Sequence, residues 1–173
     1  FFQEVATFEI TKFGFDLRGD TGLLSIIDPP RSTVPFLSAL SESTNFTCMI
    51  DPIEVDVVLW IDLLLKSVPG SVVTYADVAG ISVNDEVQGR VALASRNGAT
   101  VDPVLFMSFG SGGKVESARV RLAVQPEGEI VEISSRGTVK VTNKFSISEL
   151  KMLRDAMLRA SALNESDLIL PLD

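Results

Sequence analysis

The residues of this chain best suited to chemistry are acidic side chains in the middle of the sequence. Carboxylates can hold a divalent cation or act as an acid and base pair. The candidates are Glu54, Asp56, Asp62, Asp77, Asp85, Glu86 and Asp102. Glu54, Asp56 and Asp62 have even spacing, which places them on one face of a strand, as on any solvated face. We therefore interpret the carboxylates as solvated or interfacial. A divalent cation held between subunits is the first alternative and catalysis the second, and we assign no metal ligand.

Histidine is absent, so the chain lacks the commonest general base and the commonest metal ligand. Without histidine no Ser-His-Asp or Cys-His arrangement can form, and no residue marks a Ser–Lys dyad or a two-carboxylate enzyme. The glycine-rich segment 110–114 lacks the Walker spacing and lies between apolar segments, which indicates a hairpin loop. The sequence therefore predicts no enzyme, no catalytic residue and no cofactor-binding residue.

One cysteine and three short motifs receive no functional assignment. The single Cys48 excludes an internal disulfide, and its apolar neighbours predict a buried thiol. Arg18-Gly19-Asp20 is a tripeptide that can serve as a cell-adhesion ligand, but three residues often recur by chance. Segments 45–47 (Asn-Phe-Thr) and 164–166 (Asn-Glu-Ser) are glycosylation sequons, and no signal-peptide pattern supports their use.

Composition and charge limit the class of protein. The 173 residues suffice for one domain with a sizeable core, and 46% of them are hydrophobic. Mean hydropathy is +0.30. No apolar run reaches the roughly 18 residues that a membrane helix requires. The surplus of apolar side chains therefore indicates subunit contacts. The net charge of −8 argues against a nucleic-acid-binding surface on the chain itself.

The segment from Ile53 to Val78 organises the predicted fold. From Ile53 to Leu64 the side chains alternate between two faces, with the odd-numbered ones in the core, which is typical of a strand. The many β-branched residues favour the same interpretation, whereas the run 63–66 (Leu-Leu-Leu-Lys) favours a helix as the alternative. A Pro-Gly corner at 68–71 and a second strand at 72–76 follow.

The remaining elements complete a β-rich chain with one clear helix. Strands are predicted at 5–12, 22–27, 45–50, 88–95, 104–109, 118–124 and 168–170, and a hairpin at 129–133 and 138–142. Segment 88–95 fits a short helix nearly as well as a strand, and segment 35–43 is either a short helix or a loop. Ser146 and Glu149 form a capping-box pattern that starts a helix ending near Leu163. No linker divides 1–173, so we predict a single domain, an all-β, jelly-roll-like β-sandwich with a C-terminal α-helix.

Three segments carry a resemblance to a known family. Residues 57–64 (VVLWIDLL), leading into 67–72 (SVPGSV), are similar to a strand–corner–strand pattern, VLLW…LL…SV-x-G-x-V. Residues 90–94 (RVALA), with Asn97 and Asp102 after them, are similar to a VALAV…DN strand, and 147–169 to a late helix and the strand that follows it. In these segments the chain resembles the coat proteins of small icosahedral plant RNA viruses of the bromovirus type. Segments 1–50 and 110–143 have no counterpart in that family.

The resemblance implies a structural capsid subunit that self-assembles into a viral shell enclosing RNA. Its partners would be copies of itself and viral RNA, with no membrane, and it would be found in the virion and, during assembly, in the host cytoplasm. The sequence begins Phe1-Phe2-Gln3 without Met, so we expect it to be part of a longer polypeptide. The family's basic RNA-binding arm would then precede Phe1, and RNA binding is assigned to no residue of this sequence.

Two alternatives use the same residues differently. The spacing over 70–77 also resembles the β-rich core of plant-virus movement proteins. A winged-helix DNA-binding domain would instead have helices at 54–66, 75–80 and 85–96 and a β-wing at 104–124. The net charge of −8 opposes this second alternative, because phosphate contacts require Lys and Arg.

Overall fold

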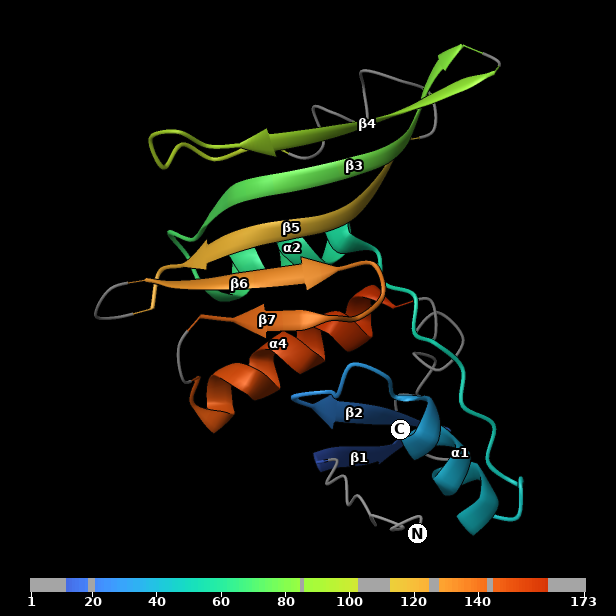
Figure 1. Cartoon of the computed structure of the whole chain (residues 1–173). Helices are drawn as coiled ribbons and strands as arrows, with labels where there is room; N and C mark the ends of the chain where they lie inside the picture. Colours follow the sequence, from blue (N-terminus) through green and yellow to red (C-terminus); the bar gives the residue numbers. More distant parts are fainter. Residues whose placement is uncertain are drawn as a thin grey trace, which may run out of the picture. The chain divides into compact units, whose positions relative to one another are not determined.

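A computed structural model describes residues 12–18, 21–84, 86–102, 113–124, 128–142 and 145–161. The chain divides into two compact units, Phe1–Asp51 and Pro52–Asp173, and each is described by itself. The described strands all pair antiparallel, and three helices accompany them (Figure 1). The mainly β architecture and the C-terminal helix expected from the sequence are therefore confirmed.

The first unit is a β-hairpin with one helix. β1 (Lys12–Arg18) and β2 (Thr21–Ile27) pair antiparallel, and α1 (Val34–Ser43) follows. A proline lies in the first turn of α1, where its missing N–H is not needed for a hydrogen bond. The rings of Phe13 and Phe36 lie 5.3 Å apart.

Two expectations for this unit are decided by the structure. Segment 35–43 is helix rather than loop. The strand expected at 45–50 is wrong, because this segment has no regular structure. The chain reverses direction there, with Asn45 at φ +50° and Phe46 at φ +56°.

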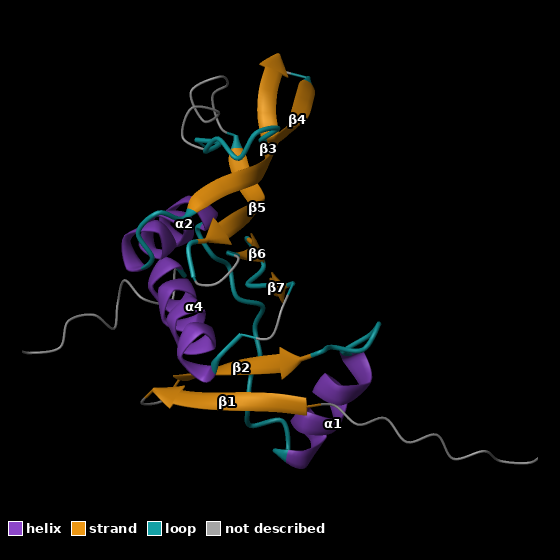
Figure 2. Ribbon diagram, turned by 90° about the vertical axis from the view of Figure 1, so that its left-hand side faces the viewer, coloured by secondary structure: helices purple, strands orange, loops and turns teal. Residues whose placement is uncertain are grey.

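The second unit is a five-stranded antiparallel sheet with two helices. Its elements are α2 (Val57–Ser67), β3 (Val72–Asn84), β4 (Val87–Ala94), β5 (Lys114–Leu122), β6 (Glu129–Ser134), β7 (Val139–Val141) and α4 (Ile147–Ala160). The strand order is β4-β3-β5-β6-β7, so β3 pairs with both β4 and β5. Figure 2 shows α2 and α4 on one side of the sheet. We call that side the helix face and the other side the open face.

The core of this unit fills the space between the helix face and the two helices. The sheet contributes Val73, Ala76, Val78, Val115, Ala118, Val120, Leu122, Val131 and Ile133, and the helices contribute Val57, Trp60, Ile61, Leu64, Leu153, Ala156, Met157 and Ala160. All of these side chains are buried, and removing their apolar surface from water is the main term that stabilises the unit.

The strand predicted over Ile53–Leu64 is wrong, because Val57–Ser67 forms helix α2. The side chain of Asp56 accepts hydrogen bonds from the backbone N–H groups of Val58 at 2.9 Å and Leu59 at 3.1 Å, and so caps the helix. The buried residues of α2 are Val57, Trp60, Ile61 and Leu64. Their spacing of i, i+3, i+4 and i+7 defines one helical face. The same run satisfies both a period of two and a period of 3.6, and the N-cap and the packing decide for the helix.

The other described elements agree with the sequence analysis. Segments 22–27, 72–76 and 129–133 are strands, and 118–122 belongs to β5. Segment 88–94 is strand β4 rather than a helix, and β6 and β7 form the expected hairpin. The capping box at Ser146 and Glu149 is present.

The winged-helix alternative is correct for only one of its three helices, since 75–80 lies in β3 and 87–94 forms β4. The strands expected at 5–11, 104–109 and 168–170 lie outside the described residues.

Candidate interaction surface

The open face carries the polar side chains that alternate with the core. On β5, Arg119 is exposed between the buried Ala118 and Val120, as the two-residue period of a strand requires. The register pairs Tyr75 of β3 with Arg119, Arg119 with Glu132 of β6, and Glu132 with Lys140 of β7. These four side chains form one row across four strands, which we call the Tyr75–Lys140 row.

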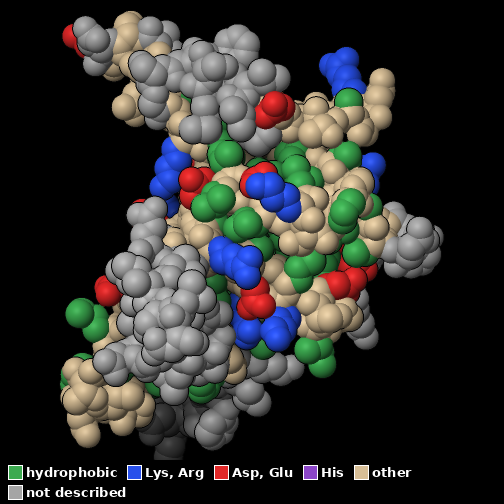
Figure 3. Space-filling view, turned by 180° about the vertical axis from the view of Figure 1, so that it is seen from behind, with side chains coloured by type: hydrophobic (Ala, Val, Ile, Leu, Met, Phe, Trp, Pro, Cys, Tyr) green, Lys and Arg blue, Asp and Glu red, His purple; other side chains and the backbone are tan. Residues whose placement is uncertain are grey.

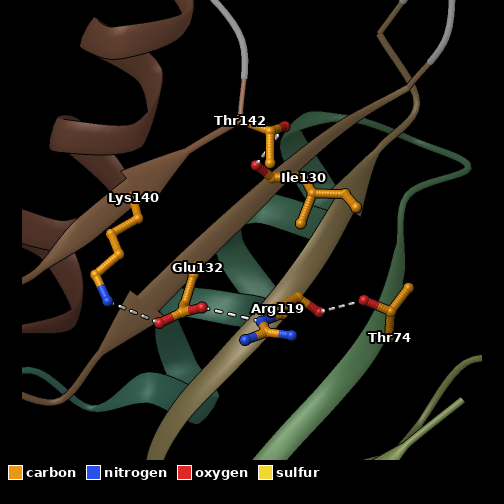
Figure 4. A network of polar contacts seen from close by, with 6 residues as sticks. All are labelled: Thr74, Arg119, Ile130, Glu132, Lys140 and Thr142. Atoms are coloured by element: carbon orange, nitrogen blue, oxygen red, sulfur yellow. Dashed lines mark hydrogen bonds and ion pairs between the residues drawn. The ribbon is translucent and has the colours of Figure 1, made fainter.

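Direct contacts hold the row together, and Figure 4 shows those among Arg119, Glu132 and Lys140. The guanidinium carbon of Arg119 lies 5.0 Å from the centroid of the Tyr75 ring, a cation–π distance. Arg119 Nε donates to Glu132 Oε2 at 2.9 Å, and Lys140 Nζ donates to Glu132 Oε1 at 3.3 Å. The hydrogen bond from Arg119, assisted by Lys140, lowers the pKa of Glu132.

A second ion pair joins β3 to β4. The side chain of Asp77 is only 8% exposed, whereas that of Arg90 is 66% exposed. Arg90 Nε donates to Asp77 Oδ1 at 2.7 Å, and its Nη2 donates to Asp77 Oδ2, so the carboxylate is held by both prongs of the guanidinium. The hydrogen bond from Arg90 lowers the pKa of Asp77 and outweighs the opposing effect of burial.

Replacing Asp77 by asparagine is expected to lower the free energy of unfolding at pH 7 by about 1–2 kcal/mol, since a charged hydrogen bond is lost beside an exposed arginine. Asp77 has a lower pKa folded than unfolded. Its stabilising contribution is therefore complete above the unfolded pKa of about 3.9, and it is lost as pH falls through the folded pKa. Urea unfolding at pH 7 and pH 3 measures the effect, and the difference between wild type and Asp77→Asn should shrink at pH 3.

Asp62→Asn is a matched control for this measurement. Asp62 accepts from Lys66 Nζ at 2.5 Å within α2, but the side chain of Asp62 is 49% exposed. An exposed ion pair between residues one helical turn apart contributes about 0.3–0.5 kcal/mol to the free energy of unfolding. An Asp62→Asn variant that loses as much stability as Asp77→Asn would contradict the special role of the Asp77–Arg90 pair.

The open face is better suited to binding than to acid–base chemistry. Cations hold both Asp77 and Glu132 in the ionised form, and a carboxylate with a lowered pKa is a weak base at neutral pH. Within the described ranges no three His, Cys, Asp or Glu side chains group in a way that could hold a metal ion. The surface offers charged groups in fixed positions on a rigid sheet, which favours contact with another macromolecule.

The structure does not bring the predicted acidic candidates together. Glu54 is exposed ahead of α2, Asp56 caps that helix, and Asp62 pairs with Lys66. Asp77 pairs with Arg90, Glu86 is exposed between β3 and β4, and Asp102 follows β4. Asp85 lies outside the described residues. The interpretation of these carboxylates as one cation site therefore finds no geometric support among the described side chains.

The other predicted residues lie apart from the open face. Cys48 is half-buried rather than buried. It lines an apolar pocket of about 320 Å³ in the first unit, together with Phe13, Leu24, Leu40, Thr44 and Ile50. Arg18 ends β1, and 19–20, 110–112 and 164–166 lie outside the described residues. Segment 45–47 is exposed after α1.

A second hollow lies on the side of the helices. Leu63 and Ser67 of α2 and Met152, Asp155, Ala156 and Arg159 of α4 line a groove of about 200 Å³. Figure 3 views the molecule from this side, where cationic and anionic side chains lie next to one another. The groove is open and small. We therefore interpret it as the space between two packed helices and not as a ligand-binding pocket.

Sequence reasoning missed the residues of the open face. The sequence analysis assigns no role to Tyr75, Arg90, Arg119, Glu132 or Lys140. The available signal is the alternation of Arg119 with Ala118 and Val120, since polar residues between core residues of a strand share the opposite face. The meeting of Tyr75, Arg119, Glu132 and Lys140 in one row depends on strand register, which pairs residues far apart in the sequence.

Comparisons with family models, with curated proteins and with solved structures find no match for this chain. None of the helices in the described part of the chain is long and apolar enough to cross a membrane.

Proposed function

We propose that this chain is a structural subunit that associates with copies of itself. The observation that carries the proposal is the number of large apolar side chains that stay exposed in both units. Among the described residues these are Phe13, Ile27, Val34, Phe46, Met49, Leu59, Val87, Val91, Val141, Ile147 and Leu150. Met49 is 85% exposed and Ile147 87%. Contact with another protein surface would remove this apolar area from water, at about 25 cal/mol per Å².

The distribution of charge supports contact between unlike surfaces of two copies. On the open face cations outnumber carboxylates: Arg90, Lys114, Arg119, Arg121 and Lys140 stand against Asp77 and Glu132. The whole chain has a net charge of −8. The rest of the chain therefore carries more negative charge than the average, which is complementary to the open face of a second copy.

The viral shell is the finer form of this proposal and rests on the family resemblance. Residues 90–94 form a strand, as the resemblance implies, whereas 57–64 form a helix in place of the first strand of the strand–corner–strand pattern. In the shell, RNA would be bound by a basic segment outside the printed sequence, and a movement-protein-like β domain is the alternative role. A jelly-roll sandwich would need a second sheet on the open face.

The test is the mass of the purified chain in solution. We expect multi-angle light scattering to give a mass above the 18.7 kDa of one chain, rising with protein concentration. Because the exposed apolar side chains carry the contact, association should persist between about 10 mM and 300 mM salt, whereas the part due to complementary charges should weaken as salt screens them. Parallel runs with EDTA and with calcium decide whether a divalent cation lies between subunits.

A mass of 18.7 kDa at every concentration and salt level would contradict self-association. Electron microscopy of the associated sample then separates a closed shell from smaller oligomers. Closed shells support the capsid form of the proposal, and discrete dimers or tetramers contradict it while leaving self-association intact.

A further inference from the structure

The two edge strands of the five-stranded sheet differ in how they are protected from pairing with another chain. β7 is only three residues long and includes Lys140, and short strands with lysine discourage edge pairing. β4 has eight residues, VQGRVALA, with no proline and Arg90 as its single charge. Among the described strands, β4 is therefore the edge of this sheet that is open to a further strand.

The ladder between β3 and β4 shows which backbone groups of β4 lack partners. Ser95 N–H donates to the carbonyl oxygen of Thr74 at 2.9 Å. Tyr75 is opposite Ala94, and the register is regular from there to Arg90. In an antiparallel pair, alternate residues direct N–H and C=O toward the partner strand. Arg90, Ala92 and Ala94 therefore direct these groups away from β3, and within the described residues no other backbone group meets them.

The side chains of β4 divide between the two faces of the sheet. Val91 is opposite Val78, and Leu93 is opposite Ala76. Val78 and Ala76 are buried on the helix face, so Val91 and Leu93 also lie on that face. No side chain of β4 is buried, and Val91 is 39% exposed. The buried core between the sheet and the helices therefore does not include β4. Val91 and Leu93 form an apolar strip along this edge of the sheet.

We propose that β4 of a second copy pairs antiparallel with β4 across a two-fold axis that passes between the two Ala92 residues. This inference rests on the proposed self-association and names one surface through which copies meet, a contact between like edges in addition to the contact between unlike charged surfaces. The pairing would join two five-stranded sheets into one continuous sheet.

The sequence of β4 is self-complementary in this register. Arg90 lies opposite Ala94 of the second copy, and the two Ala92 residues lie opposite each other. All three outward-facing residues then form hydrogen-bonded pairs, with about six backbone hydrogen bonds in total. On the helix face, Val91 lies opposite Leu93 of the second copy. The apolar strips of both copies therefore cover one another.

Other registers lose these matches. Centring the pair on Arg90 would place two guanidinium groups opposite each other, which is destabilising. Centring it on Ala94 would place Val91 opposite Asn97, beyond the end of the strand. A shift by one residue would place the free backbone groups of β4 opposite residues of the second copy whose own N–H and C=O groups face β3.

Cysteine cross-linking tests the register on the full chain, with Cys48→Ser as the background. In Ala92→Cys the two Cα atoms would lie about 5.5 Å apart, within reach of a disulfide. In the matched control Ala94→Cys, on the same strand and face, they would lie about 14 Å apart, beyond that reach. Mild oxidation should give a covalent dimer with Ala92→Cys and at least tenfold less with Ala94→Cys. A failure of Ala92→Cys to cross-link, or equal cross-linking of both variants, overturns the register.

Substitution of apolar edge residues tests the surface without a disulfide. Val91 on β4 and Val141 on β7 are 39% and 38% exposed, so lysine should be equally tolerated by the fold at either site. In sedimentation equilibrium, Val91→Lys should raise the dissociation constant of self-association at least tenfold, and Val141→Lys should raise it less than twofold. The circular dichroism spectra of both variants should be unchanged. Equal association of the two variants overturns the β4 interface while self-association stands. A wild-type chain that is monomeric throughout contradicts the proposed function as well.

Discussion

Replacing Trp60 by alanine is expected to lower the free energy of unfolding by about 3–5 kcal/mol, a large part of the 5–15 kcal/mol typical of a folded protein. Trp60 is fully buried in α2, at the contact with the sheet. The substitution removes the largest buried side chain of the core and leaves a cavity that the sheet can close only in part. Urea unfolding followed by far-ultraviolet circular dichroism measures the change, since Trp60 is the single tryptophan and its fluorescence is lost.

Trp60→Phe is the control that separates volume from polarity. The indole Nε1 of Trp60 is buried and has no hydrogen-bond partner in the part of the chain that the structure describes. An unsatisfied buried donor costs about 1–3 kcal/mol. Phenylalanine removes the unsatisfied donor, which stabilises the fold, and also removes some buried volume, which destabilises it. Trp60→Phe should therefore lower the free energy of unfolding by less than about 1.5 kcal/mol. A loss as large as that of Trp60→Ala would show that Nε1 is hydrogen-bonded in solution.

Replacing Gly137 by alanine is expected to lower the free energy of unfolding by about 2–3 kcal/mol. Gly137 turns the chain between β6 and β7 at φ +67°, a conformation that disfavours any side chain. An added Cβ would also clash with Cγ2 of Ile53, so the segment that leads into α2 would have to move. Thermal unfolding should show the loss as a Tm lower by roughly 5–10 °C.

Gly98→Ala isolates the steric part of this effect. Gly98 has a similar φ of +71°, but the nearest atom to an added Cβ is Nη1 of the flexible Arg121 at 3.5 Å. Gly98→Ala should therefore lower the free energy of unfolding only through backbone strain, by about 1 kcal/mol. Combining Gly137→Ala with Ile53→Ala should likewise recover part of the stability lost in Gly137→Ala. Equal losses for Gly98→Ala and Gly137→Ala would show that the contact with Ile53 does not contribute.

The predictions from sequence succeeded where local signals were unambiguous. The hairpin of β6 and β7 and the helix after Ser146 each have their own turn or capping residues, which act over a few positions. In contrast, residues 53–64 satisfy two periods at once. Their β-branched side chains favoured a strand, yet the side-chain cap of Asp56 and the burial of Trp60 and Leu64 stabilise a helix. Burial against other elements outweighed intrinsic propensity there.

The open face could be predicted only in part. Alternation places Arg119 on the face opposite Ala118 and Val120, and that inference is local. The partners Tyr75, Glu132 and Lys140 come from three other strands, and the pairing of Tyr75 with Arg119 lies in a ladder between β3 and β5 whose register two bulges shift. A bulge adds one residue to one strand and leaves little trace in a single sequence.

The strand order also sets the sequence in which the second unit can fold. β3 and β4 are neighbours along the chain, so their hairpin can form within microseconds from local contacts. β5 must return across residues 95–113 to pair with the other edge of β3, and closing that loop costs conformational entropy before any pairing compensates it. We therefore expect β5 to dock more slowly than the β3–β4 hairpin forms. Until it docks, the edge of β3 that later pairs with β5 lacks its backbone partners, and a nascent chain can mispair there.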